Sequence, residues 1–245
     1  MSSKQLSFLR RPYFAKRILE IGGGHEPFAG VTHAVDKFPQ DNRERAGTLV
    51  LGKGVVFKEG ELEAIPFPDE PKFDFLYVSH VLEHVLSASK AVSEINRVAK
   101  LGYLETPSPL REQIFCPFPF DKAADFHTQF CWTAGEPNTI HVIRKSEKAV
   151  GDFCACANGK FAKLVFDLKR QKGIDTEPLL SNPAKTTYLF FKAPLRLMEH
   201  EDFESACRSG SCGFSSVRRM AWRLIAPFYL ISSRSRKLKG LLAGS

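Results

Sequence analysis

A short strand that runs straight into three glycines is the feature that most constrains how this chain can fold. The segment 17–21 is rich in β-forming residues and stops at Gly22, Gly23 and Gly24. Glycine lets the backbone turn sharply and lets a ligand approach it closely, and free backbone N–H groups at such a turn can bind that ligand. A turn of purely structural glycines would look the same, so the loop predicts a ligand site only together with other residues.

Strand and helix signals alternate over the first hundred residues, which favours a parallel sheet covered by helices. Right-handed crossovers then make an α/β, doubly wound, mostly parallel Rossmann-like sheet the expected fold. Predicted strands cover residues 17–21, 33–36, 54–58, 73–78 and 103–106, and a helix covers 86–99. Two more strands are expected at 139–145 and 186–192, antiparallel and at the sheet edge, with a helix at 153–160 between them.

Three carboxylates are predicted to meet at one edge of this sheet. Glu20 directly precedes the glycines, Asp36 ends the second strand, and Glu61 follows the third. The carboxyl ends of neighbouring parallel strands share one edge, and a carboxylate after the second strand is well placed to accept hydrogen bonds from ribose hydroxyls. The sequence therefore predicts a nucleotide-like ligand in a crevice at this edge.

Over roughly the first 110 residues the chain resembles class I S-adenosylmethionine-dependent methyltransferases, particularly the type 11 group. The order of the matching segments makes the signal more specific than a lone glycine motif. They are Ile18–His25, Val35–Asp36, Glu61–Phe67, Phe73–Val85, Glu94–Lys100 and Gly102–Pro107.

This resemblance implies S-adenosylmethionine as cofactor and gives each matching residue a role. The backbone of Gly22, Gly23 and Gly24 would contact the methionine moiety, with Glu20 near its amino group or ordering the loop. Asp36 would hold the ribose hydroxyls, and Glu61 would reach the adenine amine. The Leu62 amide would lie on the adenine edge, and Ser79 and His80 would line the floor near the sulfonium.

The chain also departs from the family pattern after the glycines. Glu26 stands where a small residue is common, and Asp36 follows Glu20 by only sixteen positions, so the first helix is expected to be shortened or replaced by a loop at 27–30. This form resembles a subgroup linked to cell-surface glycan modification. The expected acceptor is a small molecule, a glycan or a lipid-linked group, with the aromatic-rich segment 107–132 as its wall.

No catalytic residue is assigned from the sequence, because a sulfonium is an activated methyl donor and in-line positioning supplies most of the rate. A base is needed only for a hydroxyl acceptor. His80 and His84 are four residues apart but have no third ligand at a convincing spacing, so capping or core packing is favoured and no metal is expected. His127 and His141 fit either an acceptor pocket or loop and core positions.

The net charge of +8 is concentrated at the C-terminus. Residues 205–245 hold eight basic residues and no acidic one, which leaves 27 basic against 27 acidic residues elsewhere. The predicted division is a methyltransferase domain at 1–205, with an acceptor-facing insertion near 107–135, and a basic amphipathic helical tail at 206–245. The neutral body argues against nucleic acid as a specific partner.

Within the tail, residues 217–242 combine arginines with Trp222, Phe228 and Tyr229. This composition suits a helix on an anionic membrane surface, and a helix docked on the body with a solvated basic face is the alternative. No secretory signal or apolar span is evident, so we expect a cytoplasmic protein, with the tail as a peripheral contact at the inner face of a membrane.

Two other functions are compatible with parts of this pattern. The chain could retain a methyltransferase fold as a non-catalytic interaction module tethered at a membrane. A nicotinamide-dependent Rossmann enzyme is disfavoured, because Pro27 stands where the GxGxxG motif has its last glycine.

Overall fold

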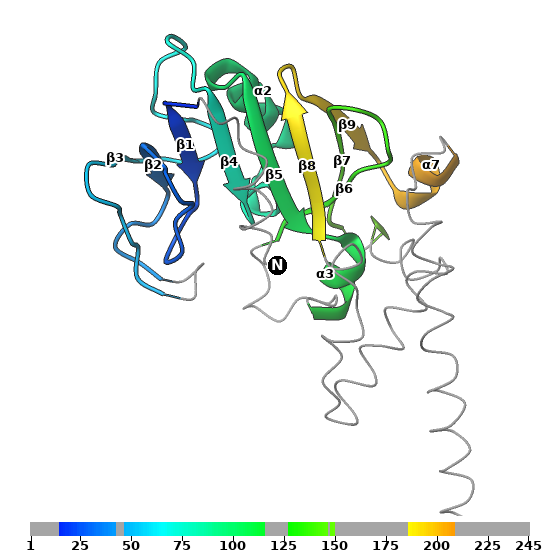
Figure 1. The fold of residues 1–245 in the computed structure, drawn as a ribbon. Coiled ribbons are helices and arrows are strands. Elements are labelled where there is room, and N and C mark those ends of the chain that lie inside the picture. Colours follow the sequence, from blue (N-terminus) through cyan, green and yellow to red (C-terminus); the bar gives the residue numbers. More distant parts are fainter. Residues whose placement is uncertain (1–14, 43–46, 116–126, 147, 150–185, 209–245) are drawn as a thin grey trace, which may run out of the picture.

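A six-stranded sheet forms the centre of the molecule in the computed structural model, which describes residues 15–42, 47–115, 127–146, 148–149 and 186–208 (Figure 1). Its strands lie in the order β3-β2-β1-β4-β5-β8. The strands from β1 to β5 are parallel to their neighbours, and β8 is antiparallel to β5. Their bounds are Ile18–Ile21 for β1, His33–Asp36 for β2, Val56–Glu59 for β3, Phe75–Ser79 for β4, Leu101–Pro107 for β5 and Thr186–Lys192 for β8.

This order confirms the predicted doubly wound, mostly parallel Rossmann-like sheet. From β1 the chain moves outward through β2 and β3, crosses back to β4, and moves the other way through β5. The carboxyl ends of β1 and β4 therefore face a topological switch point, where the two connecting segments diverge and leave a crevice. The strand order alone therefore places a potential ligand site at this edge of the sheet.

Helix α2 (Ala88–Val98) covers one face of the sheet. The Ser87 side chain caps its first turn by accepting a hydrogen bond from the Lys90 amide, and the helix ends at Ala99. Its buried residues, among them Val92, Ile95 and Val98, recur at helical spacing and enter the main hydrophobic core.

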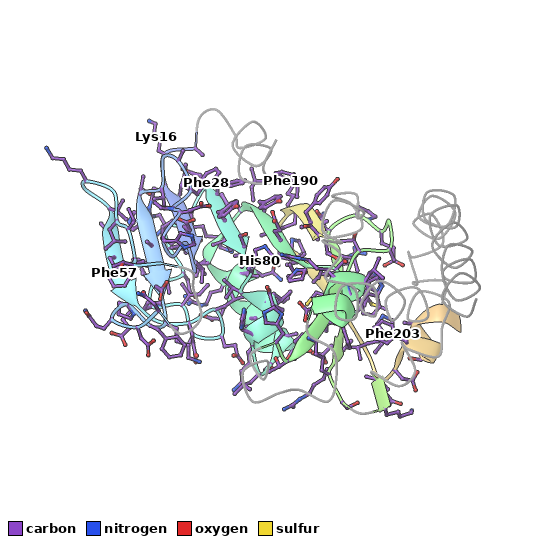
Figure 2. All side chains as sticks on the ribbon, turned by 90° about the horizontal axis from the view of Figure 1, so that it is seen from below. Lys16, Phe28, Phe57, His80, Phe190 and Phe203 are labelled. Atoms are coloured by element: carbon purple, nitrogen blue, oxygen red, sulfur yellow. The ribbon has the colours of Figure 1, made fainter. Side chains whose placement is uncertain are left out.

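The opposite face is covered by a loop instead of a first helix. Residues 22–32 contain no helix, so the predicted replacement by a loop is confirmed. Phe28 from this loop stacks on Tyr77 with ring centroids 4.6 Å apart, and Tyr77 stacks on Tyr103 at 5.3 Å. Figure 2 shows Phe28 and Phe190 on this side of the sheet, where both belong to a second, aromatic core.

The prediction for the strand at 139–145 is wrong in its placement. Strand β7 (Thr139–Arg144) lies in a separate three-stranded sheet, between β6 (Gln129–Trp132) and β9 (Arg196–His200). Ile140 and Val142 belong to the main core, whereas His141 stacks on Trp132 and His200 within the second sheet. A strand pattern buried on both faces could not assign the strand to either sheet. The strand at 186–192 is confirmed as the antiparallel edge strand β8.

The remaining elements are short. A 3-10 helix, η1 (Leu82–His84), follows β4, and α3 (Pro109–Phe115) follows β5. Helix α7 (Phe203–Arg208) follows β9. The predicted helix at 153–160 and nearly all of the predicted tail lie outside the described residues, so the domain division stays a prediction. Among the helices that are described, none has the length and apolar character needed to cross a membrane.

Asn96 on α2 ties the C-terminal strands to the body. Its side-chain amide donates to the Leu195 carbonyl oxygen at 2.9 Å, and its carbonyl oxygen accepts from the Leu195 amide at 2.7 Å. Leu195 lies in the turn between β8 and β9. One side chain therefore satisfies both backbone groups of a half-buried turn, which fixes the second sheet against the helix.

Gly102 in β5 gives a direct test of the packing between β5 and β8. A Cβ atom there would lie 2.4 Å from the Phe191 ring and 2.8 Å from the Leu76 carbonyl oxygen. We expect Gly102→Ala to lower the free energy of unfolding by about 1–3 kcal/mol, since overpacking of a close-packed site costs this much. Urea denaturation measures the change. Gly52→Ala is the control, because Gly52 is exposed and its added Cβ would meet one Val55 methyl group at 3.3 Å.

Candidate active site

A solvent-open cleft of about 770 Å³ lies at the carboxyl edge of the sheet, at the switch point between β1 and β4. Figure 2 looks onto this end of the molecule and shows His80 near its centre. The cleft brings together residues from the ends of four strands, β1 to β4, and from η1. Its lining consists of Ile21, Gly22, Gly24, Asp36, Lys37, Phe38, Asp41, Gly60, Glu61, Leu62, Glu63, His80, Val81, His84 and Val85.

Six of the nine predicted cofactor residues line this cleft: Gly22, Gly24, Asp36, Glu61, Leu62 and His80. The other three, Glu20, Gly23 and Ser79, do not. The structure therefore brings two of the three predicted carboxylates to one cavity, from the ends of β2 and β3.

The glycine loop has a conformation that favours glycine. Gly22 and Gly24 have φ angles of +69° and +58°, in the left-handed region. A Cβ atom on Gly22 would lie 2.4 Å from the Val81 side chain, which forms part of the opposite wall. The Gly22 amide donates to the Val35 carbonyl oxygen at 2.9 Å, which holds the turn against β2.

Glu20 orders this loop from beneath the cleft. Its carboxylate oxygens both accept from the Phe28 amide, at 2.9 and 3.0 Å, and the side chain is 1% exposed. A Cβ atom on Gly23 would lie 2.4 Å from the same carboxylate, so Gly23 leaves room for it. Of the two roles predicted for Glu20, the structure shows the ordering of the loop.

The carboxylates that do line the cleft are held in different ways. Asp36 is largely buried, and its Oδ1 accepts from the Phe38 amide at 2.9 Å, which fixes the side chain at the end of β2. Glu61 forms an ion pair with Lys37 at 2.7 Å, and these side chains are 39% and 54% exposed. Ion pairs this exposed contribute about 0–1 kcal/mol, so a ligand amine can displace Lys37 at little cost.

His80 follows β4 with a φ angle of +56°, and its ring lies between two buried carboxylates. Nδ1 is 3.2 Å from Glu83 Oε1, and Nε2 is 3.6 Å from Glu105 Oε1. Burial would lower the pKa of His80, but its interactions with Glu105 and Glu83 outweigh this and raise the pKa to about 9. His80 is therefore protonated at neutral pH, so it cannot act there as a general base.

A second group of polar side chains adjoins the cleft behind His84. The His84 and His127 rings meet edge to face, with centroids 4.4 Å apart, and Glu83 is buried beside them. His127 Nδ1 lies 2.6 Å from Glu112 Oε1, and Lys145 donates to Oε2 of the same carboxylate. Burial would raise the pKa of Glu112, but His127 and Lys145 hold it below its ordinary value.

The structure separates the two histidines whose roles the sequence left open. His127 joins the group at the cleft, whereas His141 is fully buried and stacks on Trp132 and His200, in the second sheet. His141 thus takes the core position. Sequence reasoning missed Glu83, Glu112 and Lys145; only Glu83 carried a signal, as the residue beside His84 in the matching segment after β4.

Residues 26–104 match a family model described as a methyltransferase domain. This match confirms the predicted resemblance to the type 11 methyltransferases, whose cofactor is S-adenosylmethionine, and it agrees with the cofactor predicted from the sequence. The matched range contains Asp36, Glu61 and His80 and ends before the aromatic-rich segment 107–132. No curated protein sequence matches the chain.

Several solved structures of methyltransferases overlap with part of the chain. An S-adenosylmethionine-dependent methyltransferase from Thermotoga maritima is 26% identical to this chain over the matched region. The match covers 46% of this chain and 53% of the Thermotoga protein, with a TM-score of 0.33. One from Mesorhizobium loti is 17% identical, with coverages of 44% and 53% and a TM-score of 0.35. This chain thus spans about half the length of those two proteins.

Gly22 tests whether the glycine loop shapes the cleft. We expect Gly22→Ala to weaken binding of S-adenosylhomocysteine at least about tenfold, because a left-handed alanine is strained by roughly 1 kcal/mol or more and its Cβ meets Val81. Isothermal titration calorimetry measures the affinity. Adding Val81→Ala should restore part of it by removing the contact but not the strain; an unchanged affinity in Gly22→Ala would show that the loop lies away from the ligand.

Proposed function

We propose that this protein is an enzyme that transfers a methyl group from S-adenosylmethionine to a small-molecule, glycan or lipid-linked acceptor. One observation carries the proposal: a single cleft collects six residues that the family resemblance assigns to the cofactor. They come from separate segments of the chain, at the ends of β1, β2, β3 and β4. A glycine turn without a ligand would not require this convergence.

Each wall of the cleft fits one part of the cofactor. The Asp36 carboxylate would accept hydrogen bonds from the ribose hydroxyls, and the backbone at Gly22 and Gly24 would contact the methionine moiety. Glu61 would exchange Lys37 for the adenine amine, beside the Leu62 amide. The transfer itself is an in-line displacement at a methyl carbon already activated by the sulfonium, so the protein contributes mainly by holding the two reactants in line.

The acceptor would enter from the side of His80, Val81 and His84, which line the cleft together with Asp36. The aromatic segment 107–132 begins at the end of β5, beside η1, and returns to it at Thr128, whose amide donates to the Glu83 carbonyl oxygen. Phe130 and Trp132 are buried in the core of the second sheet, so the wall would be formed by aromatics earlier in the segment. Aromatic rings suit sugar faces and apolar groups, and this composition supports a glycan or lipid-linked acceptor.

Asp36 is the sharpest test of the cofactor assignment. We expect Asp36→Ala to weaken S-adenosylhomocysteine binding about 10–100-fold, because hydrogen bonds to a charged group are worth about 1.5–3 kcal/mol. Titration calorimetry measures the change. Glu59→Ala is the matched control, since Glu59 pairs with Asp36 in register on β3 but is exposed and absent from the cleft lining.

If the unaltered chain gives no heat with S-adenosylhomocysteine and no rise in its melting temperature, the enzyme proposal is wrong. The chain would then be better described as a non-catalytic methyltransferase-fold module. Equal affinity in Asp36→Ala and Glu59→Ala would instead place the ligand elsewhere.

For the basic residues at 217–242 we propose a contact with an anionic membrane surface. Their sequence supports this, because each Lys or Arg near such a surface contributes about 1 kcal/mol. The full chain should float with phosphatidylserine vesicles and lose this on joint Arg218→Glu, Arg219→Glu and Arg223→Glu substitution. The control reverses three exposed lysines of the body, Lys53, Lys90 and Lys192. Equal loss in both variants would contradict a specific role of the tail.

A further inference from the structure

Glu83, His84 and His127 place one potential ligand atom each within 4.8 Å of one another. Glu83 and His84 lie on η1, and His127 is brought in from the segment that leads into β6. We propose that these three side chains form a binding site for a divalent transition-metal ion at the acceptor side of the cleft. The third ligand is the one that sequence spacing alone did not provide.

The buried carboxylate of Glu83 is the observation that points to a cation. Its side chain is 1% exposed, and Oε1 lies 3.2 Å from His80 Nδ1. Oε2 has no hydrogen-bond partner within the described residues. A buried polar atom without a partner is unfavourable, and more so when it is charged, so a cation bound to Oε2 would remove this penalty.

His127 is oriented in the way that metal-binding histidines are. With Nδ1 donating to Glu112 at 2.6 Å, the ring presents Nε2 as the nitrogen with a lone pair. A carboxylate behind the ring fixes its tautomer and raises its basicity as a ligand. Lys145 balances the charge of Glu112, and both side chains are almost completely buried. Glu83 and Glu105 are both buried and both face the single ring of His80, so one imidazole stands against two carboxylates and Glu83 can still attract a cation.

The backbone holds the three ligands in place across a long sequence separation. The Thr128 amide donates to the Glu83 carbonyl oxygen at 2.6 Å, and the Thr128 hydroxyl donates to the Val85 carbonyl oxygen. The Gln129 side chain donates to the same Val85 oxygen at 3.3 Å. Bonds of about 2.0–2.2 Å to a metal would thus need side-chain rotations, and η1 need not move relative to β6.

Two imidazoles and one carboxylate favour ions such as Zn²⁺, Co²⁺ or Mn²⁺ over Mg²⁺ and Ca²⁺, which prefer ligand sets made of oxygen. Three protein ligands leave at least one coordination position for another molecule, as in catalytic zinc sites. His84 belongs to both the cluster and the cleft lining, so that position is available from the cleft.

The role of this ion rests on the proposed function and narrows it to an oxygen acceptor. An acceptor hydroxyl bound to such an ion would have a lowered pKa and would lose its proton to water. Its oxygen lone pair would form the new O–CH₃ bond as the S–CH₃ bond breaks, with the S–CH₃ electron pair left on sulfur in neutral S-adenosylhomocysteine. No side chain would then need to act as the base.

The test uses the full chain and metal ions alone. Co²⁺ titration should produce a visible absorption band that saturates at one ion per chain, and Zn²⁺ should abolish it by competition, whereas Mg²⁺ should not. His127→Asn and Glu83→Gln should each weaken Co²⁺ binding at least about 100-fold. Glu112→Gln should keep the band but weaken binding about 10–100-fold, as expected for a residue that orients a ligand.

The control is His200→Asn, which alters the other described histidine pair, His141 with His200, and should leave the Co²⁺ titration unchanged. S-adenosylhomocysteine binding, measured on every variant, reports whether the fold and cofactor cleft are intact. The metal proposal is overturned if the unaltered chain binds no stoichiometric Co²⁺ or Zn²⁺, or if His200→Asn is the variant that loses it. Cofactor binding without metal binding would overturn the metal proposal and leave the proposed function standing. Metal binding without cofactor binding would overturn the proposed function and leave the metal site standing.

Discussion

The two hydrogen bonds between the Glu20 carboxylate and the Phe28 amide hold in place the loop that stands where the family pattern has its first helix. A first helix would normally cover this face of the sheet and present its N-terminal amides to the cofactor. Here a loop covers this face instead. The carboxylate anchors the loop at its midpoint, so that Phe28 reaches Tyr77 and completes the aromatic core. The Glu20 carboxylate also fills the space beside Gly23, on the side away from the cleft, while Gly22 and Gly24 line the cleft itself.

Much of the fold and of the cofactor side of the cleft could be predicted, because both depend on local sequence. Strand periodicity and glycine conformation are properties of neighbouring residues, and parallel strands bring their carboxyl ends to one edge whatever the connections are. Asp36 and Glu61 meet for this reason. Glu20 shows the limit of such reasoning. The position of its carboxylate at the end of the first strand was predictable, but its partner was not, because the Phe28 amide reaches it only where a loop replaces the first helix.

The acceptor side could not be predicted in the same way, because its partners are far apart in the chain. His127 meets His84 only because Thr128 bonds to the backbone of η1, and Glu112 reaches His127 from α3 on the other side of the undescribed stretch 116–126. Strand β7 shows the same limitation. Its pattern fits either sheet, and its place is decided by β6 and β9, which lie on either side of it in space.

The two sides of the cleft therefore differ in how they are built, and His80 lies at their junction. Its positive charge is fixed by Glu83 and Glu105, so one carboxylate, Glu83, serves both His80 and the cluster with His84 and His127. A cation bound at Glu83 Oε2 would compete electrostatically with protonated His80 for the same group, separated by the width of one carboxylate. The acceptor side and the cofactor side of the cleft are thus joined through the two oxygens of one carboxylate, so a substitution of Glu83 would disturb both.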